Sequence, residues 1–387
     1  MPISCPTESH LPMRVCFDIT AALAQSAGVG RYTRELAAAL TTLPDAPDLL
    51  LLHNRPLTMQ LDRLPAALRD LPRLEIPAGN RLWRLALLHP LHRRAWGLNR
   101  VRCDVYHGTD WIAPALPIPT VLTIHDLSAL RYPQHHTPLN RWYSRLALPQ
   151  MVRRATAIIA NSHATAQDVA ALLGVAPERI TTTYLGVDQQ HFAPRPPALA
   201  RQRVQAWLGF EGPYILALGT LEPRKNLTTL LHAYAQLGDD APRLVLAGAR
   251  GWQAEPIFAL AEQQAIRARV ALPGFVPDAL LPDLYAAAEL FVYPSLFEGF
   301  GLPVVEAMAC GAAVITSTTS SLPEVAGDAA MLVSPTDING LTQAMQQVLG
   351  SPALAADLRQ RAPRQAAQFT WQRCARETLA VYRRVAG

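Results

Sequence analysis

The sequence predicts an α/β protein built from two doubly wound, Rossmann-like domains with a cleft between them. The chain has 387 residues, which suits two to three domains. Along it, short apolar runs alternate with amphipathic helical patterns, and this alternation predicts parallel sheets covered by helices on both faces. The proline-rich segment 194–197 interrupts the alternation and is typical of a linker. Because such sheets bind ligands at the carboxyl ends of their strands, we expect the functional site in the cleft.

The first domain is expected over residues 13–193, after a tail formed by residues 1–12. Its elements follow from apolar runs of strand length and from amphipathic patterns of helical period. Strands are predicted at 15–19, 49–53, 105–107, 120–124 and 157–160, and helices at 32–40 and 163–173.

The second domain is expected over residues 204–368, after a linker at 194–203. The same alternation of strand and helix patterns begins again there. Strands are predicted at 214–218, 244–247, 270–272, 290–292 and 313–315, and helices at 227–237, 281–288 and 304–310. A C-terminal segment, 369–387, contains a last helical pattern at 371–385.

Composition excludes several classes of protein. Hydrophobic residues make up 50% of the chain and charged residues 17%, which excludes general disorder. The sequence contains neither a membrane-length apolar run nor a leader pattern, so we expect a soluble, cytoplasmic protein. Five cysteines without paired spacing predict no disulfide framework and no zinc site. With neither His-Glu-x-x-His nor Asp-x-Asp present, no metal is expected.

The basic residues are unusual in kind and in placement. Lys225 is the only lysine among 35 basic residues, which indicates either a site that needs a compact ammonium group or codon bias. No acid lies between Glu75 and Asp104, where arginines from Arg81 to Arg102 alternate with leucine and tryptophan. Such a stretch suits an anionic membrane surface or an acidic substrate, and equally a solvated helix pair. Nucleic acid is not expected, because no nucleic-acid-binding motif accompanies the charge.

The first candidate site is a glycine-containing turn between a predicted strand and a predicted helix. Gly28 and Gly30 let backbone amides approach an anion at the N-terminus of the helix. Asp18 and Arg31 add polar groups beside this turn. With two glycines only, the pattern is equally typical of a plain tight turn.

The second candidate site is the segment 219–226, Gly-Thr-Leu-Glu-Pro-Arg-Lys-Asn, which leaves a strand and enters a helix. Asn226 is the expected N-cap of that helix. Arg224 and Lys225 place two adjacent cations beside a helix N-terminus, an arrangement that suits a diphosphate. Pro223 and Gly219 restrict the loop, so we favour phosphate binding over a solvated surface pair.

The third candidate site is the segment 298–306, Glu-Gly-Phe-Gly-Leu-Pro-Val-Val-Glu. Pro303 suits the first position of a helix, whose first turn would contain Glu306. Glu298 and Glu306 then flank a glycine-lined pocket, and carboxylates accept hydrogen bonds from the vicinal hydroxyls of sugars. Alternatively Glu306 only complements the helix dipole, which leaves Glu298 unexplained. Three backbone amides of the turn would be free to hold an oxyanion or a hydroxyl, those of Phe300, Gly301 and Leu302.

These motifs resemble those of the retaining glycosyltransferases of family 4, which have the two-domain GT-B fold and take a sugar from a nucleotide donor. The resemblance covers nearly the whole chain. It rests on Asp18 with segment 28–32, His125-Asp126, Asn161-Ser162, segments 219–226 and 273–276, and the two glutamates separated by seven residues.

The resemblance implies a role for each main site residue. Arg224 and Lys225 resemble the diphosphate clamp that stabilises the leaving group without a metal. Glu298 would bind donor-sugar hydroxyls near the reacting carbon, and His125 would contact the same sugar. Glu306 would bind the ribose hydroxyls. Catalysis would then depend on positioning and electrostatics, with no obligatory side-chain base.

Further donor contacts are implied for backbone groups. The remaining donor-binding positions are Gly28, Gly30, Gly219, Val276, Gly299, Phe300, Gly301 and Leu302, and Arg31 and Asp126 are expected on the acceptor side. The final helix would cross back onto the N-terminal domain, and closure about the linker would complete the site.

The expected activity is transfer of a hexose to a glycan or lipid-linked glycan. The form of the segments 219–226 and 298–311 resembles mannosyltransferases of surface-polysaccharide pathways, so GDP-mannose is the first donor to consider. The donor is a substrate, and no cofactor is expected. A non-catalytic sugar-nucleotide-binding subunit and a nucleotide-sugar epimerase are the alternatives. Peripheral contact with the inner membrane face through Arg81–Arg102 stays open.

Overall fold

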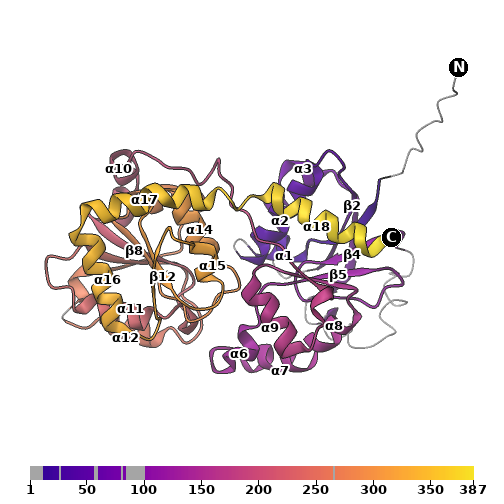
Figure 1. Cartoon of the computed structure of the whole chain (residues 1–387), viewed down its shortest axis with the longest axis horizontal. Coiled ribbons are helices and arrows are strands. Elements are labelled where there is room, and N and C mark those ends of the chain that lie inside the picture. The colour runs from indigo at the N-terminus through magenta and orange to yellow at the C-terminus, as the bar shows by residue number, and fades with distance from the viewer. Residues whose placement is uncertain (1–11, 26–27, 56–59, 80–81, 84–100, 265) are drawn as a thin grey trace, which may run out of the picture.

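The structure is a computed structural model that describes residues 12–25, 28–55, 60–79, 82–83, 101–264 and 266–387. Two lobes are visible, each with a parallel sheet between layers of helices (Figure 1). The predicted fold class, two doubly wound Rossmann-like domains, is confirmed. The predicted tail at 1–12 and the basic stretch from Arg81 to Arg102 fall almost entirely outside the described residues.

The N-terminal lobe contains a seven-stranded parallel sheet in the order β3-β2-β1-β4-β5-β6-β7. The strand order changes direction between β1 and β4, which is the place where sheets of this type bind ligands. The two edge strands, β3 and β7, were absent from the sequence prediction. The strands are β1 (Arg14–Asp18), β2 (Asp48–Arg55), β3 (Arg73–Gly79), β4 (Val105–Gly108), β5 (Thr120–Ile124), β6 (Ala157–Ala160) and β7 (Ile180–Thr182).

The helices of this lobe have local sequence signals at their ends. Ser162 begins α9 by accepting a hydrogen bond from the amide of Thr165 at 3.0 Å, and Gly174 ends it in the left-handed conformation. The described helices here are α1 (Thr20–Ala24), α2 (Val29–Thr41), α3 (Ala66–Arg69), α6 (Ser128–Arg131), α7 (Pro138–Leu146), α8 (Leu148–Arg154) and α9 (His163–Leu173).

The C-terminal lobe contains a six-stranded parallel sheet in the order β10-β9-β8-β11-β12-β13. Its strands are β8 (Tyr214–Leu218), β9 (Arg243–Ala247), β10 (Val270–Gly274), β11 (Leu290–Tyr293), β12 (Val314–Ser317) and β13 (Met331–Val333). Its helices are α10 (Pro197–Leu208), α11 (Leu227–Ala235), α12 (Glu255–Ala261), α13 (Leu281–Ala287), α14 (Leu302–Ala309), α15 (Leu322–Ala326), α16 (Ile338–Gly350) and α17 (Pro352–Ala366). Because α10 begins at Pro197, much of the predicted linker 194–203 is helical; the domain boundaries themselves stay predictions.

The last helix, α18 (Trp371–Ala386), crosses from the C-terminal lobe back to the N-terminal lobe (Figure 1). It packs against α2, β4, β5 and β6. Its inner face buries Trp371, Leu379 and Tyr382. Since burial of a large apolar side chain contributes about 1.5–3 kcal/mol, this face fixes the helix to the N-terminal lobe.

The two chain segments that connect the lobes run side by side. The amide of Val187 in the first segment donates to the carbonyl of Phe369 in the second at 3.1 Å. Gly186 makes this approach feasible, because a Cβ atom there would lie 2.2 Å from the backbone nitrogen of Trp371. The lobes are therefore connected by two segments of chain that are hydrogen-bonded to each other.

No helix among the described residues combines the length and the apolar character needed to cross a membrane.

Candidate functional site

Most of the predicted site residues line one cleft between the two lobes. The cavity has a volume of about 400 Å³ and lies at the carboxyl ends of strands from both sheets. The predicted residues in its lining are Gly28, Arg31, His125, Asp126, Gly219, Arg224, Lys225, Glu298, Gly299, Phe300, Gly301, Leu302 and Glu306. Segments far apart in the sequence thus meet at one place.

Two predicted donor-binding residues, Gly30 and Val276, are not part of this lining. A Cβ atom at Gly30 would lie 2.1 Å from the carbonyl oxygen of Gln25, so this glycine allows α2 to begin close to the preceding chain. The side chain of Val276 is buried in the main hydrophobic cluster. Both residues therefore have a structural explanation that needs no ligand.

The loop after β8 carries the two cations predicted to bind a diphosphate. Gly219 has a φ angle of 146°, which other residues rarely adopt, and the chain leaves the sheet there. A short 3₁₀ helix, η5 (Pro223–Lys225), then presents Arg224 and Lys225 to the cavity.

Asn226 anchors this loop to two neighbouring loops. Its side-chain amide donates to the carbonyls of Pro294 and Pro335, at 3.0 and 2.6 Å. The residue itself is left-handed and its side chain makes no capping hydrogen bond to α11. Asn226 is therefore the N-cap residue of α11, as predicted, but its side-chain oxygen accepts from Thr229 Oγ1 at 2.8 Å and its amide group holds two neighbouring loops.

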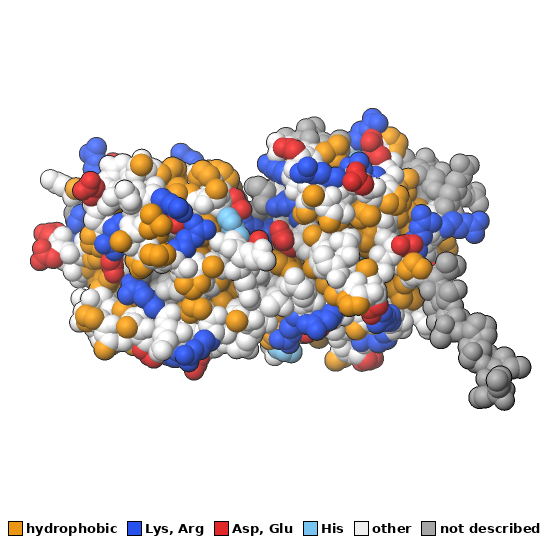
Figure 2. All heavy atoms as spheres, turned by 90° about the horizontal axis from the view of Figure 1, so that it is seen from above, with side chains coloured by type: hydrophobic (Ala, Val, Ile, Leu, Met, Phe, Trp, Pro, Cys, Tyr) orange, Lys and Arg blue, Asp and Glu red, His pale blue; other side chains and the backbone are white. Residues whose placement is uncertain are grey.

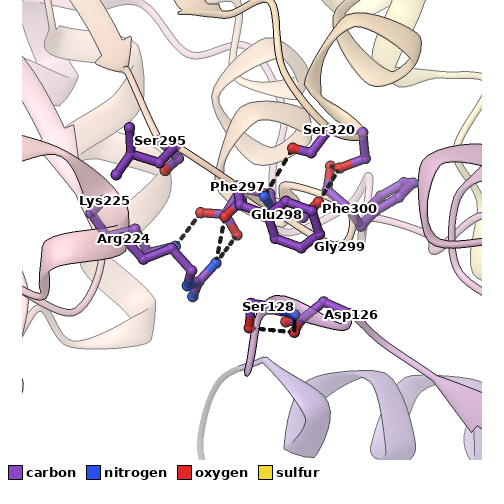
Figure 3. Close-up of polar contacts among 12 residues, drawn as sticks. Asp126, Ser128, Arg224, Lys225, Ser295, Phe297, Glu298, Gly299, Phe300 and Ser320 are labelled. Atoms are coloured by element: carbon purple, nitrogen blue, oxygen red, sulfur yellow. Dashed lines mark hydrogen bonds and ion pairs between the residues drawn. The ribbon is translucent and has the colours of Figure 1, made fainter. Parts of the chain in front are cut away.

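Arg224 and Lys225 both point at the carboxylate of Glu298 (Figure 3). Lys225 Nζ lies 2.6 Å from Oε1, and Arg224 Nη1 lies 2.7 Å from Oε2. Arg224 also donates to the carbonyl of Phe297 and to Glu222 Oε1, each at 2.9 Å. Carboxylates therefore hold both cations in place in this structure.

The electrostatics of this cluster keep Glu298 ionised. Burial alone would raise the pKa of Glu298, but the charges of Arg224 and Lys225 and the hydrogen bond from Lys225 outweigh it and hold the pKa at about 2. Burial lowers the pKa of Lys225, and the nearby Glu298 opposes that effect. Glu298 therefore accepts hydrogen bonds as a carboxylate at neutral pH.

Tyr293, the last residue of β11, is a member of the cluster that the sequence analysis missed. Its hydroxyl accepts from Lys225 Nζ at 2.5 Å and donates to Glu298 Oε1 at 2.9 Å. Lys225 Nζ also lies 4.9 Å from the centroid of the Tyr293 ring. Burial, with the charge of Glu298, raises the pKa of Tyr293 well above its ordinary value, so the phenol stays protonated. Its position at the end of an apolar strand, directly before Pro294, was the available signal.

The turn before α14 is shaped by two serines from the α15 segment. Ser321 Oγ donates to the carbonyls of Glu298 and Phe300 at 3.0 and 2.9 Å, and Ser320 Oγ accepts from the amide of Glu298 at 2.9 Å (Figure 3). Gly301 has a φ angle of 99°. Within the described chain, no protein group accepts a hydrogen bond from the three amides predicted to be free, those of Phe300, Gly301 and Leu302.

Helix α14 begins one residue earlier than predicted. Leu302 is its first residue, so Pro303 is second and Glu306 lies beyond the first turn. A role for Glu306 as a partner of the helix N-terminus is therefore excluded. Its carboxylate instead accepts from Tyr285 Oη at 3.0 Å and forms an ion pair with Arg31.

Arg31 links the two lobes. It extends from α2 in the N-terminal lobe and forms ion pairs with Glu306 and with Asp278, both in the C-terminal lobe. Its guanidinium carbon also lies 5.4 Å from the centroid of the Phe192 ring. The carboxylate predicted to bind ribose is thus occupied by an arginine in this structure.

His125 lies directly after β5 and contacts the opposite lobe through its backbone. A Cβ atom at Gly299 would lie 1.7 Å from the carbonyl oxygen of His125, so only glycine fits at this position. Burial lowers the pKa of the His125 side chain. Because Nε2 donates to the carbonyl of Thr109 at 2.8 Å, the neutral ring has its lone pair on Nδ1. His125 can therefore accept a hydrogen bond from a hydroxyl in the cleft.

Asp126 lines the same cavity from the N-terminal lobe (Figure 3). Its Oδ1 accepts from the backbone amide and the hydroxyl of Ser128, at 2.8 and 2.5 Å. One carboxylate oxygen is thereby fixed at the start of α6, and Oδ2 has no hydrogen bond of its own in the described chain.

A further contact between the lobes, also missed by the sequence analysis, is made by Glu324 of α15. Its two carboxylate oxygens accept from the amides of His163 and Ala164 at the N-terminus of α9, each at 3.0 Å. Tyr184 Oη donates to the same carboxylate at 2.8 Å. A C-terminal-lobe carboxylate thus occupies the positive end of an N-terminal-lobe helix.

Across the described ranges, no group of three or more His, Cys, Asp or Glu side chains could hold a metal ion. The concentrated positive charge of the cleft comes instead from Arg31, Arg224 and Lys225.

The fold and the cleft define a GT-B glycosyltransferase. Residues 26–191 match the family Glycosyltransferase Family 4, and residues 203–365 match the family Glycosyl transferases group 1. The chain is 34% identical over 374 residues to the O-antigen chain mannosyltransferase B of Escherichia coli, covering 92% of this chain and 96% of the relative. This protein belongs to the family 4 glycosyltransferases.

Other known proteins agree with this assignment. The chain is 31% identical over 301 residues to an MMP alpha-(1->4)-mannosyltransferase of Mycolicibacterium hassiacum, covering 72% of this chain and 70% of the relative. A sucrose-phosphate synthase from Thermosynechococcus elongatus superposes with a TM-score of 0.75 at 21% identity, over 96% of this chain and 98% of that one. Anabaena HepE in complex with UDP-glucose superposes with a TM-score of 0.74 at 20% identity, over 95% and 100%. These structures share the fold.

Proposed function

We propose that this glycosyltransferase moves mannose from GDP-mannose to a glycan or lipid-linked glycan of a surface polysaccharide, on the cytoplasmic side and with retention of the anomeric configuration. The observation that carries the proposal is the 34% identity to the O-antigen chain mannosyltransferase B over 96% of that relative. The Mycolicibacterium relative, also named a mannosyltransferase, supports the same sugar.

The hydrogen-bond inventory of the two cations supports diphosphate binding. Lys225 uses two of its three N–H groups, on Tyr293 and Glu298. Arg224 donates to Phe297, Glu298 and Glu222, which leaves part of its five-donor fork unused. Both side chains line the cavity, so a diphosphate can accept hydrogen bonds from the remaining N–H groups. The ion pairs of Arg224 and Lys225 with Glu298 can stay intact when it binds.

The sugar would lie between the lobes. Glu298, held as a carboxylate, accepts from donor hydroxyls, His125 Nδ1 accepts from another hydroxyl, and the free amides at Phe300 to Leu302 donate to oxygens of the donor. Negative charge that develops on the departing phosphate is stabilised by Arg224 and Lys225. The proposed transfer needs no metal, because these two cations supply the charge that a metal supplies elsewhere.

The deciding experiment incubates the purified protein with GDP-mannose, UDP-glucose, UDP-galactose and ADP-glucose and measures nucleotide release, with and without a lipid-linked glycan extract. We expect release from GDP-mannose, unchanged by EDTA, and an α-linked product in the NMR spectrum. Preferential release from a UDP-sugar refutes the donor proposal. Loss of activity in EDTA refutes the cation clamp, and a β-linked product refutes retention.

A further inference from the structure

Helix α7 presents an apolar stripe to solvent. Leu139, Trp142 and Leu146 are 62%, 41% and 53% exposed, although large apolar side chains are normally buried. They occupy positions i, i+3 and i+7, which share one face of a helix. Tyr143, the residue after Trp142, is buried against the lobe and donates from its hydroxyl to the carbonyl of Trp111 at 3.3 Å, which holds α7 in place.

The surroundings of this stripe are positively charged. No acidic residue occurs between Asp126 and Asp168, a stretch with five arginines. Arg131 forms an ion pair with Asp168. The three that are free of ion pairs within the described residues are Arg141 and Arg145 on α7 and Arg153 on α8.

The opposite face of the molecule is different. Figure 1 places α7 at the lower edge of the N-terminal lobe, and Figure 2 shows the molecule from above. On that upper face acidic side chains lie among the basic and hydrophobic ones over both lobes. The upper face therefore carries acidic groups of the kind that the stretch between Asp126 and Asp168 lacks.

We propose that this face of α7 binds the surface of an anionic lipid bilayer. Helix α7 has nine residues, too few to cross a membrane, so it would lie in the plane of the interface. Leu139 and Leu146 would enter the acyl boundary, and Trp142 would lie at headgroup depth, where indole rings are favoured. Arg141 and Arg145 would contact lipid phosphates.

The charge pattern favours a membrane over a second copy of this chain. A two-fold dimer through α7 would bring the same surface of both copies together. Arg141 and Arg145 would then face arginines, without any acid from this stretch to neutralise them. An anionic bilayer supplies the complementary charge.

Helix α7 follows the cleft closely in the chain, so membrane binding through α7 would affect where the cleft lies. Asp126 lines the donor cleft, α6 and a 3₁₀ turn, η3 (Pro133–His135), follow it directly, and α7 begins at Pro138. Docking through α7 would therefore hold the N-terminal side of the cleft near the bilayer. This use depends on the proposed lipid-linked acceptor, whereas binding of α7 to lipid does not.

The test is flotation of the full-length protein with vesicles of phosphatidylcholine alone or with phosphatidylglycerol added. Wild type should float with the anionic vesicles and not with the neutral ones. Leu139→Ser/Trp142→Ser/Leu146→Ser should reduce the bound fraction at least about tenfold, as the apolar anchor is removed. Arg141→Gln/Arg145→Gln should reduce it by a similar factor, since each arginine near an anionic surface changes partitioning about fivefold.

Matched controls separate the α7 surface from general hydrophobicity. Leu172→Ser/Leu199→Ser/Leu332→Ser removes three other exposed leucines and should float like wild type. All variants should retain wild-type circular dichroism and wild-type donor hydrolysis, so failure of the proposed function is seen separately from failure of membrane binding.

Three results overturn the proposal. The first is wild-type protein that binds no anionic vesicle. The second is an α7 triple variant that floats like wild type, which assigns membrane contact to another surface. The third is a dimer on size-exclusion chromatography that the triple variant abolishes, which makes α7 a contact between two copies.

Discussion

The guanidinium of Arg31 in the N-terminal lobe pairs with the carboxylate of Glu306 in the C-terminal lobe. Replacement by Gln removes this ion pair and leaves a buried carboxylate with Tyr285 as its remaining partner. We expect Arg31→Gln to lower the free energy of unfolding by about 1–3 kcal/mol. The unliganded protein should also show a larger radius of gyration in small-angle X-ray scattering. Arg55→Gln, which breaks an exposed pair within one lobe, is the control and should change neither quantity appreciably.

Lys225 should matter for turnover more than for folding. We expect Lys225→Ala to reduce kcat by about 10²–10³-fold, because in the proposed reaction the ammonium stabilises charge on the leaving phosphate. Arg250→Ala, which removes an exposed cation from the same lobe, should leave kcat unchanged. Steady-state kinetics and thermal unfolding of both variants measure the two effects. Turnover equal to wild type in Lys225→Ala would remove this residue from the catalytic cluster.

Glu324 should hold the lobes together from the other side of the cleft. Glu324→Gln keeps the shape of the side chain but removes the charge at the N-terminus of α9, together with one of the two acceptor oxygens. We expect a loss of about 1–2 kcal/mol in unfolding free energy and faster limited proteolysis between the lobes. Asp357→Asn, in an exposed pair on α17, is the comparison. Equal proteolysis of the two variants would contradict the role in closure.

We expect buried His107 to lower the free energy of unfolding as the pH falls below neutral. It is buried under α18, with Nδ1 2.5 Å from Tyr382 Oη and Nε2 2.8 Å from Thr123 Oγ1. Burial, with a smaller effect of His125, lowers its pKa from 6.5 to about 3. As the pH falls, the unfolded chain takes up the proton first. Stability from neutral His107 is therefore complete above the unfolded pKa and is lost as pH falls toward the folded one.

Because of this histidine, we expect the free energy of unfolding to fall by about 2 kcal/mol between about pH 7 and about pH 5. Urea unfolding of wild type and of His107→Gln at both pH values measures it. The variant should show a smaller pH slope, with the remainder from groups such as His125, whose pKa is lowered in the same direction. A slope equal to that of wild type would show that the pKa of His107 is the same in the folded and unfolded states.

Local patterns in the sequence were sufficient for the class of fold and for most of the cleft. Buried parallel strands read as continuous apolar runs, so β8 and β11 were predicted near their observed positions. The edge strands β3 and β7 were not predicted. Buried and exposed residues alternate along β3, so it lacks a continuous apolar run, and β7 has only three residues. The cations of segment 219–226 and the glutamates of 298–306 were recognisable because proline and glycine fix their loops.

Individual side-chain contacts between the lobes could not be predicted, since they depend on how two separate sheets are placed. Nothing in the segment around Arg31 indicates that it reaches Glu306, and Glu324 gives no local sign that it meets α9. Asn226 shows the same limit on a smaller scale: it occupies the N-cap position of α11 as predicted, but no local pattern indicates that two carbonyls from other loops accept its amide hydrogens.

The crossing of α18 has a consequence for how this protein can be divided. A fragment that stops at the predicted boundary near residue 193 lacks Trp371, Leu379 and Tyr382, and the apolar side of α2 that they cover would face water. The complementary fragment would carry those side chains with nothing to cover them. The N-terminal and C-terminal lobes are therefore not independent, exchangeable units: a chimera that replaces the N-terminal lobe must take its matching C-terminal helix from the same parent.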